Sequence, residues 1–258
     1  MKFRPILFST PMVQAILNGT KKQTRRIVKP HPNFDTAWKN KGGFELPDID
    51  VSGDLLGLSI ADNSGLKGVG CCVPNVKVKA HKDDIFWVRE TFCEAGNFAS
   101  DQFVNSEVIA FKTQEAFFYE DNTPYWGLTG KKLDTEYWNW DKLKWKPSIF
   151  MPKDVCRIFL KITNVRVERL QDISEEESVL EGIENFWQDD SKTVNAYRNY
   201  LATKKELEKD SWAHVAEDAI DSFKSLWQSI NGVDNWYENP YVWVYEFELI
   251  EKPEGFSD

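Results

Sequence analysis

The chain has 258 residues, of which 41% are hydrophobic, and its formal net charge is −9 with a pI near 5.0. This length suits one large domain, or one small domain with long insertions. The negative charge disfavours stable binding to duplex DNA, because such binding depends on many cationic contacts to phosphates. The sequence has no long apolar run and no signal-peptide pattern, so we expect a cytoplasmic protein without membrane contact.

The cysteines do not predict a metal site. Cys71 and Cys72 are adjacent, whereas zinc ligands are usually separated by about two to four residues. A site completed by His81 remains the minor alternative. We therefore expect reduced thiols and neither a metal nor a cofactor.

The N-terminal part predicts a strand over residues 3–9 and then a helix. Thr10 is suited to be the N-cap of this helix, and Pro11 its first helical residue. Gly19 is placed to end the helix in a left-handed conformation. The basic segment "KKQTRRIVK", residues 21–29, therefore begins in a turn and leads into an extended stretch.

The rest of the chain predicts strands, helices and two long insertions. The insertions cover about 31–80, which is rich in Gly, Asn, Asp and Pro, and about 94–146, which is dense in aromatic residues. Strands are expected at 83–92, 156–170 and 239–250, and helices at 174–182, 184–212 and 211–230. Ser174 and Glu177 form a capping box at the start of the first of these helices. Gly182 and Gly232 are placed to end helices.

This order of elements predicts an α+β fold. Few helices and several strongly apolar strands favour a mixed, barrel-like sheet flanked by a few helices. We expect a single domain over residues 1–258 that carries the two long insertions.

The basic segment contains side chains suited to nucleophilic catalysis. A threonine hydroxyl becomes a nucleophile when a neighbouring base accepts its proton. A lysine can act as that base where desolvation or nearby cations favour the neutral amine. Lys21 and Thr24 are spaced so that a turn can bring them together. The alternative is a solvated basic loop, which composition alone favours.

Two other segments contain candidate site residues. Glu181 is expected in the last turn of a short helix, where the helix dipole disfavours a carboxylate, so it is either functional or a surface glutamate. Arg89 and Glu90 lie in an apolar strand and point to opposite faces, which predicts an ion pair or a pocket for one of them. Trp87 shares a face with Arg89 and is suited either to stacking on a base or to the core.

Four segments in this order resemble the ASCH-domain family of the PUA-like superfamily. They are "ILNGTKKQTRR" (16–26), "DDIFWVRETF" (83–92), "LQDISEEESVLEGI" (170–183) and "VWVYEFELI" (242–250). The additional segment "FSTPMVQAIL" makes the chain most similar to the long phage and prophage members. The resemblance implies a PUA-like mixed β-barrel.

The resemblance also implies an activity and a site. Compact members of the family are amidohydrolases that remove the acyl group from acetylated cytidine, using a Lys, a Thr and a Glu. By position these residues are Lys21, Thr24 and Glu181, and Arg26 matches an arginine near the substrate. Lys22 stands where the family usually has a threonine, so it competes with Lys21 for the lysine role.

Further candidate substrate-binding residues lie in the shared segments. They are Ser9, Met12, Trp87, Arg89 and Glu90. The family's usual Gly-Asp ahead of the central strand is replaced by Asp83 and Asp84 here.

We therefore expect a metal-free amidohydrolase that removes an acyl group from the exocyclic amine of acylated cytidine or cytosine. The alternative is a noncatalytic protein that binds RNA or a modified base in the same pocket, because one fold can serve both functions. A third hypothesis is a phage-encoded protein that binds a host factor through its insertions. The expected partner is a modified pyrimidine nucleoside or RNA.

Overall fold

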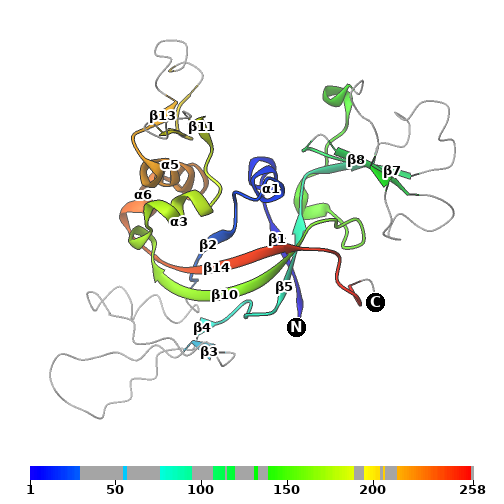
Figure 1. Cartoon of the computed structure of the whole chain (residues 1–258), viewed down its shortest axis with the longest axis horizontal. Coiled ribbons are helices and arrows are strands. Elements are labelled where there is room, and N and C mark those ends of the chain that lie inside the picture. The colour runs from blue at the N-terminus through cyan, green and yellow to red at the C-terminus, as the bar shows by residue number, and fades with distance from the viewer. Residues whose placement is uncertain are drawn as a thin grey trace. The chain divides into compact units, whose positions relative to one another are not determined.

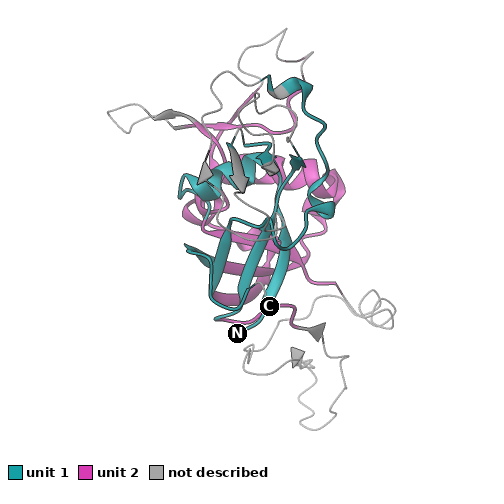
Figure 2. Ribbon diagram, turned by 90° about the vertical axis from the view of Figure 1, so that its right-hand side faces the viewer, with its two compact units in different colours: residues 1–21, 83–162, 247–258 teal, residues 22–82, 163–246 magenta. Residues whose placement is uncertain are grey.

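The computed structural model describes only part of the chain in detail. The described residues are 1–29, 55–56, 76–94, 107–113, 115–119, 131–132, 139–188, 195–203, 206 and 214–256. Most of the expected insertion at 31–80, and parts of the one at 94–146, lie outside them. The chain divides into two compact units, which Figure 2 distinguishes by colour. Unit 1 comprises residues 1–21, 83–162 and 247–258, and unit 2 comprises residues 22–82 and 163–246.

The largest sheet has five strands in the order β1-β5-β10-β14-β2. Their bounds are Phe3–Leu7 (β1), Ile85–Arg89 (β5), Phe159–Arg169 (β10), Tyr241–Ile250 (β14) and Gln23–Ile27 (β2). β1 is parallel to β5, whereas β5 and β10, and likewise β14 and β2, pair antiparallel. Figure 1 shows β10 and β14 as two long neighbouring strands, and each strand has residues in both units.

Unit 1 also contains helix α1 and a smaller antiparallel sheet. The helix spans Thr10–Leu17, and the sheet consists of β6 (Phe92–Glu94), β7 (Glu107–Phe111), β8 (Glu115–Tyr119) and β9 (Lys131–Lys132). Two short 3-10 helices follow at Trp140–Lys142 and Ser148–Phe150. The described part of the expected insertion at 94–146 thus contains strands and 3-10 helices. The apolar, aromatic residues of β7 and β8 suit a pleated sheet.

The core of unit 1 is aromatic. Phe256, close to the C-terminus, is fully buried there, and its ring lies 4.7 Å from that of Phe159 in an edge-on arrangement. Trp87 and Phe111 belong to the same cluster. Large rings of this kind bury much apolar area, so the C-terminal segment is anchored in the core of unit 1.

Within the described residues, unit 2 contains three further helices of defined bounds and two small sheets. The helices are α3 (Glu175–Leu180), α5 (Ala219–Asn231) and α6 (Val233–Tyr237), with a 3-10 turn at Leu170–Asp172. The sheets are β11 (Asn185–Gln188) with β12 (Asn195–Arg198) and β13 (Val215–Ala216), and β3 (Leu55–Leu56) with β4 (Val76–Lys77). Their core includes Phe223, Trp227 and Trp236.

Two helix predictions in unit 2 are only partly right. The stretch 184–212 forms strands at 185–188 and 195–198, where "NFWQ" and "NAYR" supply aromatic residues that suit a sheet. The helix expected at 211–230 is confirmed as α5, but it begins at Ala219, because the side chain of Asp218 accepts a hydrogen bond from the Asp221 N–H at 2.7 Å and caps the helix there.

Local signals predicted other element ends correctly. Gly19 has a φ of +76° and Gly182 a φ of +80°, as expected for residues that end helices. The capping box of Ser174 and Glu177 is present in both directions. The N-cap of α1 is Ser9 rather than Thr10, because the extended backbone ends at Ser9 and its carbonyl already accepts from Val13 at 3.0 Å.

The fold is mixed α+β, with most of its regular structure in strands and few helices. Among the described residues no closed barrel is found, so the PUA-like topology stays a prediction. None of the helices in the described ranges combines the length and the apolar character needed to cross a bilayer.

Candidate functional site

The basic segment leaves α1 through a turn whose backbone donors are in use. The N–H groups of residues 19 to 21 donate to carbonyl oxygens of α1 at 3.0 Å. The N–H of Lys22 donates to the carbonyl oxygen of Leu180, in α3, at 2.9 Å. These four N–H groups therefore already have acceptors within the protein.

The interpretation of this segment as a solvated loop is wrong for its key residues. Lys21 is 2% exposed and Thr24 is 1% exposed, and Arg25 is also buried. Lys22 and Lys29 are exposed. Of the two adjacent lysines, Lys21 is thus the buried one, and its Nζ lies 5.5 Å from the ring centroid of Phe8.

Strand β2 divides the remaining residues between two faces. Because side chains alternate along a strand, Gln23 and Arg25 point to one face, and Thr24 and Arg26 point to the other. The pairing with β14 places Tyr245 opposite Thr24, and Trp243 opposite Arg26. The face that carries the predicted nucleophile is therefore continued by two aromatic side chains.

Arg25 is the centre of an ion-pair network on the first of these faces. Its Nη1 donates to Oε1 of Glu181 at 3.0 Å, and its Nη2 donates to Glu177 at 2.9 Å and to Glu168. Its guanidinium carbon also lies 5.8 Å from the ring centroid of Phe223, in α5. One buried side chain thereby ties β2 to β10 and to α3.

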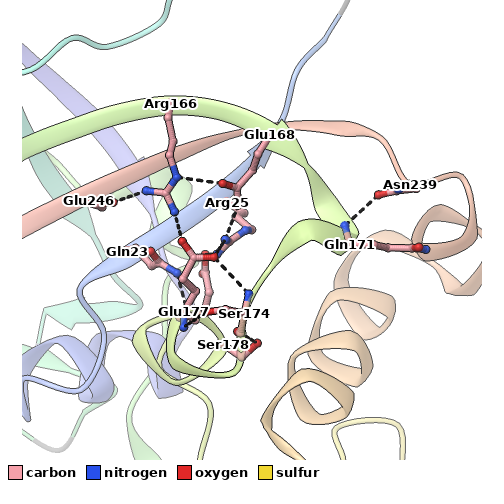
Figure 3. Close-up of polar contacts among 11 residues, drawn as sticks. Gln23, Arg25, Arg166, Glu168, Gln171, Ser174, Glu177, Ser178, Asn239 and Glu246 are labelled. Carbon is pink, nitrogen blue, oxygen red and sulfur yellow. Dashed lines mark hydrogen bonds and ion pairs between the residues drawn. The ribbon is translucent and has the colours of Figure 1, made fainter. Parts of the chain in front are cut away.

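A second guanidinium completes this network, as Figure 3 shows. Arg166 donates to Glu168 at 2.9 Å and also pairs with Glu177 and Glu246. Burial alone would lower the pKa of Arg166, but the three carboxylates outweigh it and raise that pKa. Glu168 and Glu177 are therefore each shared by two arginines.

Glu181 is not a surface glutamate. It ends α3 as the C-cap residue and is 4% exposed. A carboxylate at the C-terminal end of a helix faces the negative pole of the helix dipole, and the guanidinium of Arg25 offsets this repulsion. The oriented carboxylate also acts on Arg26. Burial lowers the pKa of the Arg26 guanidinium, and Glu181 and Tyr245 partly oppose that shift.

Within unit 2, Arg26 shares a face of β2 with Thr24 and interacts electrostatically with Glu181. Lys21 is the last residue of unit 1 and precedes Thr24 by three positions in the chain.

The candidate residues of the strand expected at 83–92 make structural contacts. Trp87 belongs to the aromatic core, and the guanidinium of Arg89 lies 5.4 Å from its ring centroid. Arg89 also donates to the carbonyl oxygens of Met151, at 3.2 Å, and of Ile149. Glu90 is buried and accepts both hydrogen bonds of a bidentate pair with Arg157 at 2.9 Å. The expected ion pair is thus confirmed for Glu90, and Trp87 adopts the core alternative.

Ser9 and Met12 lie at the start of α1. Ser9 is exposed and its side chain makes no capping hydrogen bond, whereas Met12 is half-buried. Their expected part in substrate binding stays a prediction.

Sequence reasoning missed Arg25 and Tyr245. The sequence did contain a signal for Arg25. Side chains alternate along a short strand, so Arg25 and Thr24 must point to opposite faces, and a charged residue is then placed on the face that packs inward. No local signal identifies Tyr245, because its place opposite Thr24 depends on the register between β2 and β14.

No group of three or more His, Cys, Asp or Glu side chains suited to a metal ion is found in the described ranges, which exclude Cys71 and Cys72. No family model, curated protein or solved structure matches the chain.

Proposed function

We propose that this protein is an amidohydrolase of the ASCH type, with a PUA-like fold, that removes the acyl group from the exocyclic amine of acylated cytidine or cytosine. One observation carries the proposal. The sequence resemblance selects Lys21, Thr24 and Glu181, and each of these side chains is at most 4% exposed, although two of them are of charged types. Charged side chains are rarely buried unless they are paired or functional.

The chemistry follows from the residue types. The Oγ1 of Thr24 adds to the acyl carbonyl carbon, while the neutral amine of Lys21 accepts the hydroxyl proton. The carbon–nitrogen bond then breaks, and the lysine ammonium returns the proton to the departing amine, which leaves as cytidine. Water, deprotonated by Lys21, hydrolyses the acyl ester of Thr24 and regenerates the hydroxyl. Glu181, held by Arg25, orients the lysine or the departing amine.

The burial of these groups has two consequences. Bulk water is kept from the site, apart from the water that hydrolyses the acyl ester, which strengthens the electrostatic interactions during the reaction. The substrate must also displace whatever covers Thr24 and Lys21, because each is almost fully buried. Opening of the site is therefore expected to contribute to KM.

A second function is supported by the contact between Arg25 and Glu181. The carboxylate of Glu181 already accepts a hydrogen bond from Arg25 at 3.0 Å. A structural role of this kind suits a noncatalytic protein that binds RNA or a modified base. This alternative predicts salt-sensitive binding that Arg26→Ala weakens, without turnover.

The test incubates the protein with N4-acetylcytidine and measures the release of cytidine by chromatography. We expect the wild-type protein to hydrolyse this substrate. Lys21→Met should lower kcat by about 10²–10⁴-fold, and Thr24→Val should lower it by at least as much. Lys22→Met, at the exposed neighbour, is the matched control and should retain activity. Equal rates for Lys21→Met and Lys22→Met would contradict the assignment of the base, and an inert wild type would contradict the amidohydrolase proposal.

A further inference from the structure

Stabilisation of the oxyanion requires donors that the turn after α1 does not supply. When Thr24 adds to an acyl carbonyl, negative charge develops on the carbonyl oxygen and needs preorganised hydrogen-bond donors. The backbone N–H groups of residues 19 to 22 already donate to protein carbonyls. These four N–H groups are therefore engaged, and side chains on the face of β2 that carries Thr24 are the candidate donors.

Two such side chains lie on that face. Arg26 is on β2 itself, two positions beyond Thr24. Tyr245 is on β14, directly opposite Thr24 in the antiparallel register, and it is buried. Directly opposed residues have Cβ atoms about 4.5–5.5 Å apart, so their side chains pack together on one face.

The electrostatics connect Tyr245 to the same position. Tyr245 is among the groups that oppose the lowering of the Arg26 pKa, after burial as the dominant cause and together with Glu181. The phenol therefore lies close enough to the guanidinium to interact with it electrostatically. A buried tyrosine hydroxyl is usually engaged as a hydrogen-bond donor or acceptor, and a phenol is a good donor to an anion.

We infer that the O–H of Tyr245 and the guanidinium of Arg26 together form the oxyanion-binding site for the tetrahedral intermediate on Thr24. This inference rests on the proposed amidohydrolase function. Tyr245 donates a hydrogen bond and keeps its proton throughout, so it takes no part in the proton transfers of Lys21. The competing explanation is that Tyr245 only fills the core between β14 and its neighbours.

The matched experiment compares Tyr245→Phe with Tyr241→Phe. Tyr241 lies four positions earlier on the same strand, points to the same face and is also buried, but it is opposite no predicted site residue. Each change removes one phenol oxygen. We expect Tyr245→Phe to lower kcat by about 10²–10³-fold with little change in KM, as for other oxyanion donors, and Tyr241→Phe to stay near wild type.

A binding measurement separates failure of the inference from failure of the function. The probe is cytidine that carries a methylphosphonamidate on its exocyclic amine, which mimics the tetrahedral oxyanion. Tyr245→Phe should weaken its binding by the same factor as kcat. If wild type is active but the two tyrosine variants behave alike in both assays, Tyr245 is not an oxyanion donor and the proposed function stands. If wild type neither turns over nor binds the probe, both proposals fall.

A second variant covers the case in which Tyr245→Phe does not fold. Replacement of Tyr245 by 3-fluorotyrosine keeps the shape of the ring and makes the phenol more acidic. Because the donor must be protonated, the alkaline limb of the kcat profile should move to lower pH. An unchanged alkaline limb in a folded, active variant would overturn the inference.

Discussion

Arg25→Met is the substitution that tests the ion-pair network most directly. Methionine has a similar length but no charge, so the guanidinium is removed with little change in buried volume. The side chain of Arg25 is completely buried, and it donates to Glu181, Glu177 and Glu168. Its loss leaves the buried carboxylate of Glu181 without this partner.

The expected loss of stability follows from those contacts. Removal of one partner from a buried ion pair costs about 3–5 kcal/mol, because the remaining charge is left uncompensated. Glu168 and Glu177 keep Arg166 as a partner, whereas Glu181 loses the hydrogen bond that Arg25 donates to it. Since a domain is stable by only about 5–15 kcal/mol, we expect a large decrease in the urea midpoint.

The assay is urea unfolding followed by tryptophan fluorescence, to which Trp227 and Trp236 in the core of unit 2 contribute. Arg198→Met is the matched control, because Arg198 and Glu184 form a pair at 2.7 Å whose side chains are 45% and 47% exposed. Such exposed pairs contribute at most about 1 kcal/mol.

A double variant identifies the cause of the loss. Replacement of Glu181 by Gln in the Arg25→Met background removes the buried charge, and we expect it to recover about 1–3 kcal/mol. A loss below about 1 kcal/mol for Arg25→Met alone, or no recovery in the double variant, would refute the network as the reason that Glu181 is held in place.

Three further predictions concern local features. Ser174→Ala should destabilise the protein by about 1 kcal/mol in urea unfolding, because it removes the side chain that caps α3, and Ser174→Gly should cost less. Asn239→Ala should lower the free energy of unfolding more than Asn239→Gly does, because Asn239 has a φ of +44°, which glycine adopts more easily than alanine. Both changes remove the oxygen that accepts from the Gln171 N–H, so equal losses of stability would contradict this explanation by backbone strain. Burial raises the pKa of the Cys93 and Cys156 thiols to about 11 and about 12, so in a variant with serine at positions 71 and 72 neither should react with iodoacetamide at about pH 8 until the protein unfolds. These pKa values exceed the ordinary value of 9.0, so the buried neutral thiols stabilise the folded protein fully below pH 9.0. This contribution to the free energy of unfolding is lost as the pH rises through about 11 to 12, and urea unfolding at increasing pH would measure the loss.

Local chemistry made part of the fold predictable. The capping box at Ser174, the left-handed Gly19 and Gly182, and the strongly apolar strands each depend on a few neighbouring residues. Predictions failed where the signal was weak or mixed. Charged residues in 184–212 favoured a helix, but the aromatic residues of β11 and β12 pair as strands instead.

The sequence by itself determined which residues are candidates for the site, because Lys21, Thr24, Arg26 and Glu181 were all selected from motif and position. The tertiary structure decided which of them are buried and what they contact. Arg25 meets its carboxylate partners across 143 to 156 positions of chain, and Tyr245 reaches Thr24 only through the register of two strands. Contacts of this kind leave no trace in the neighbouring sequence, since they arise only when distant segments are folded together.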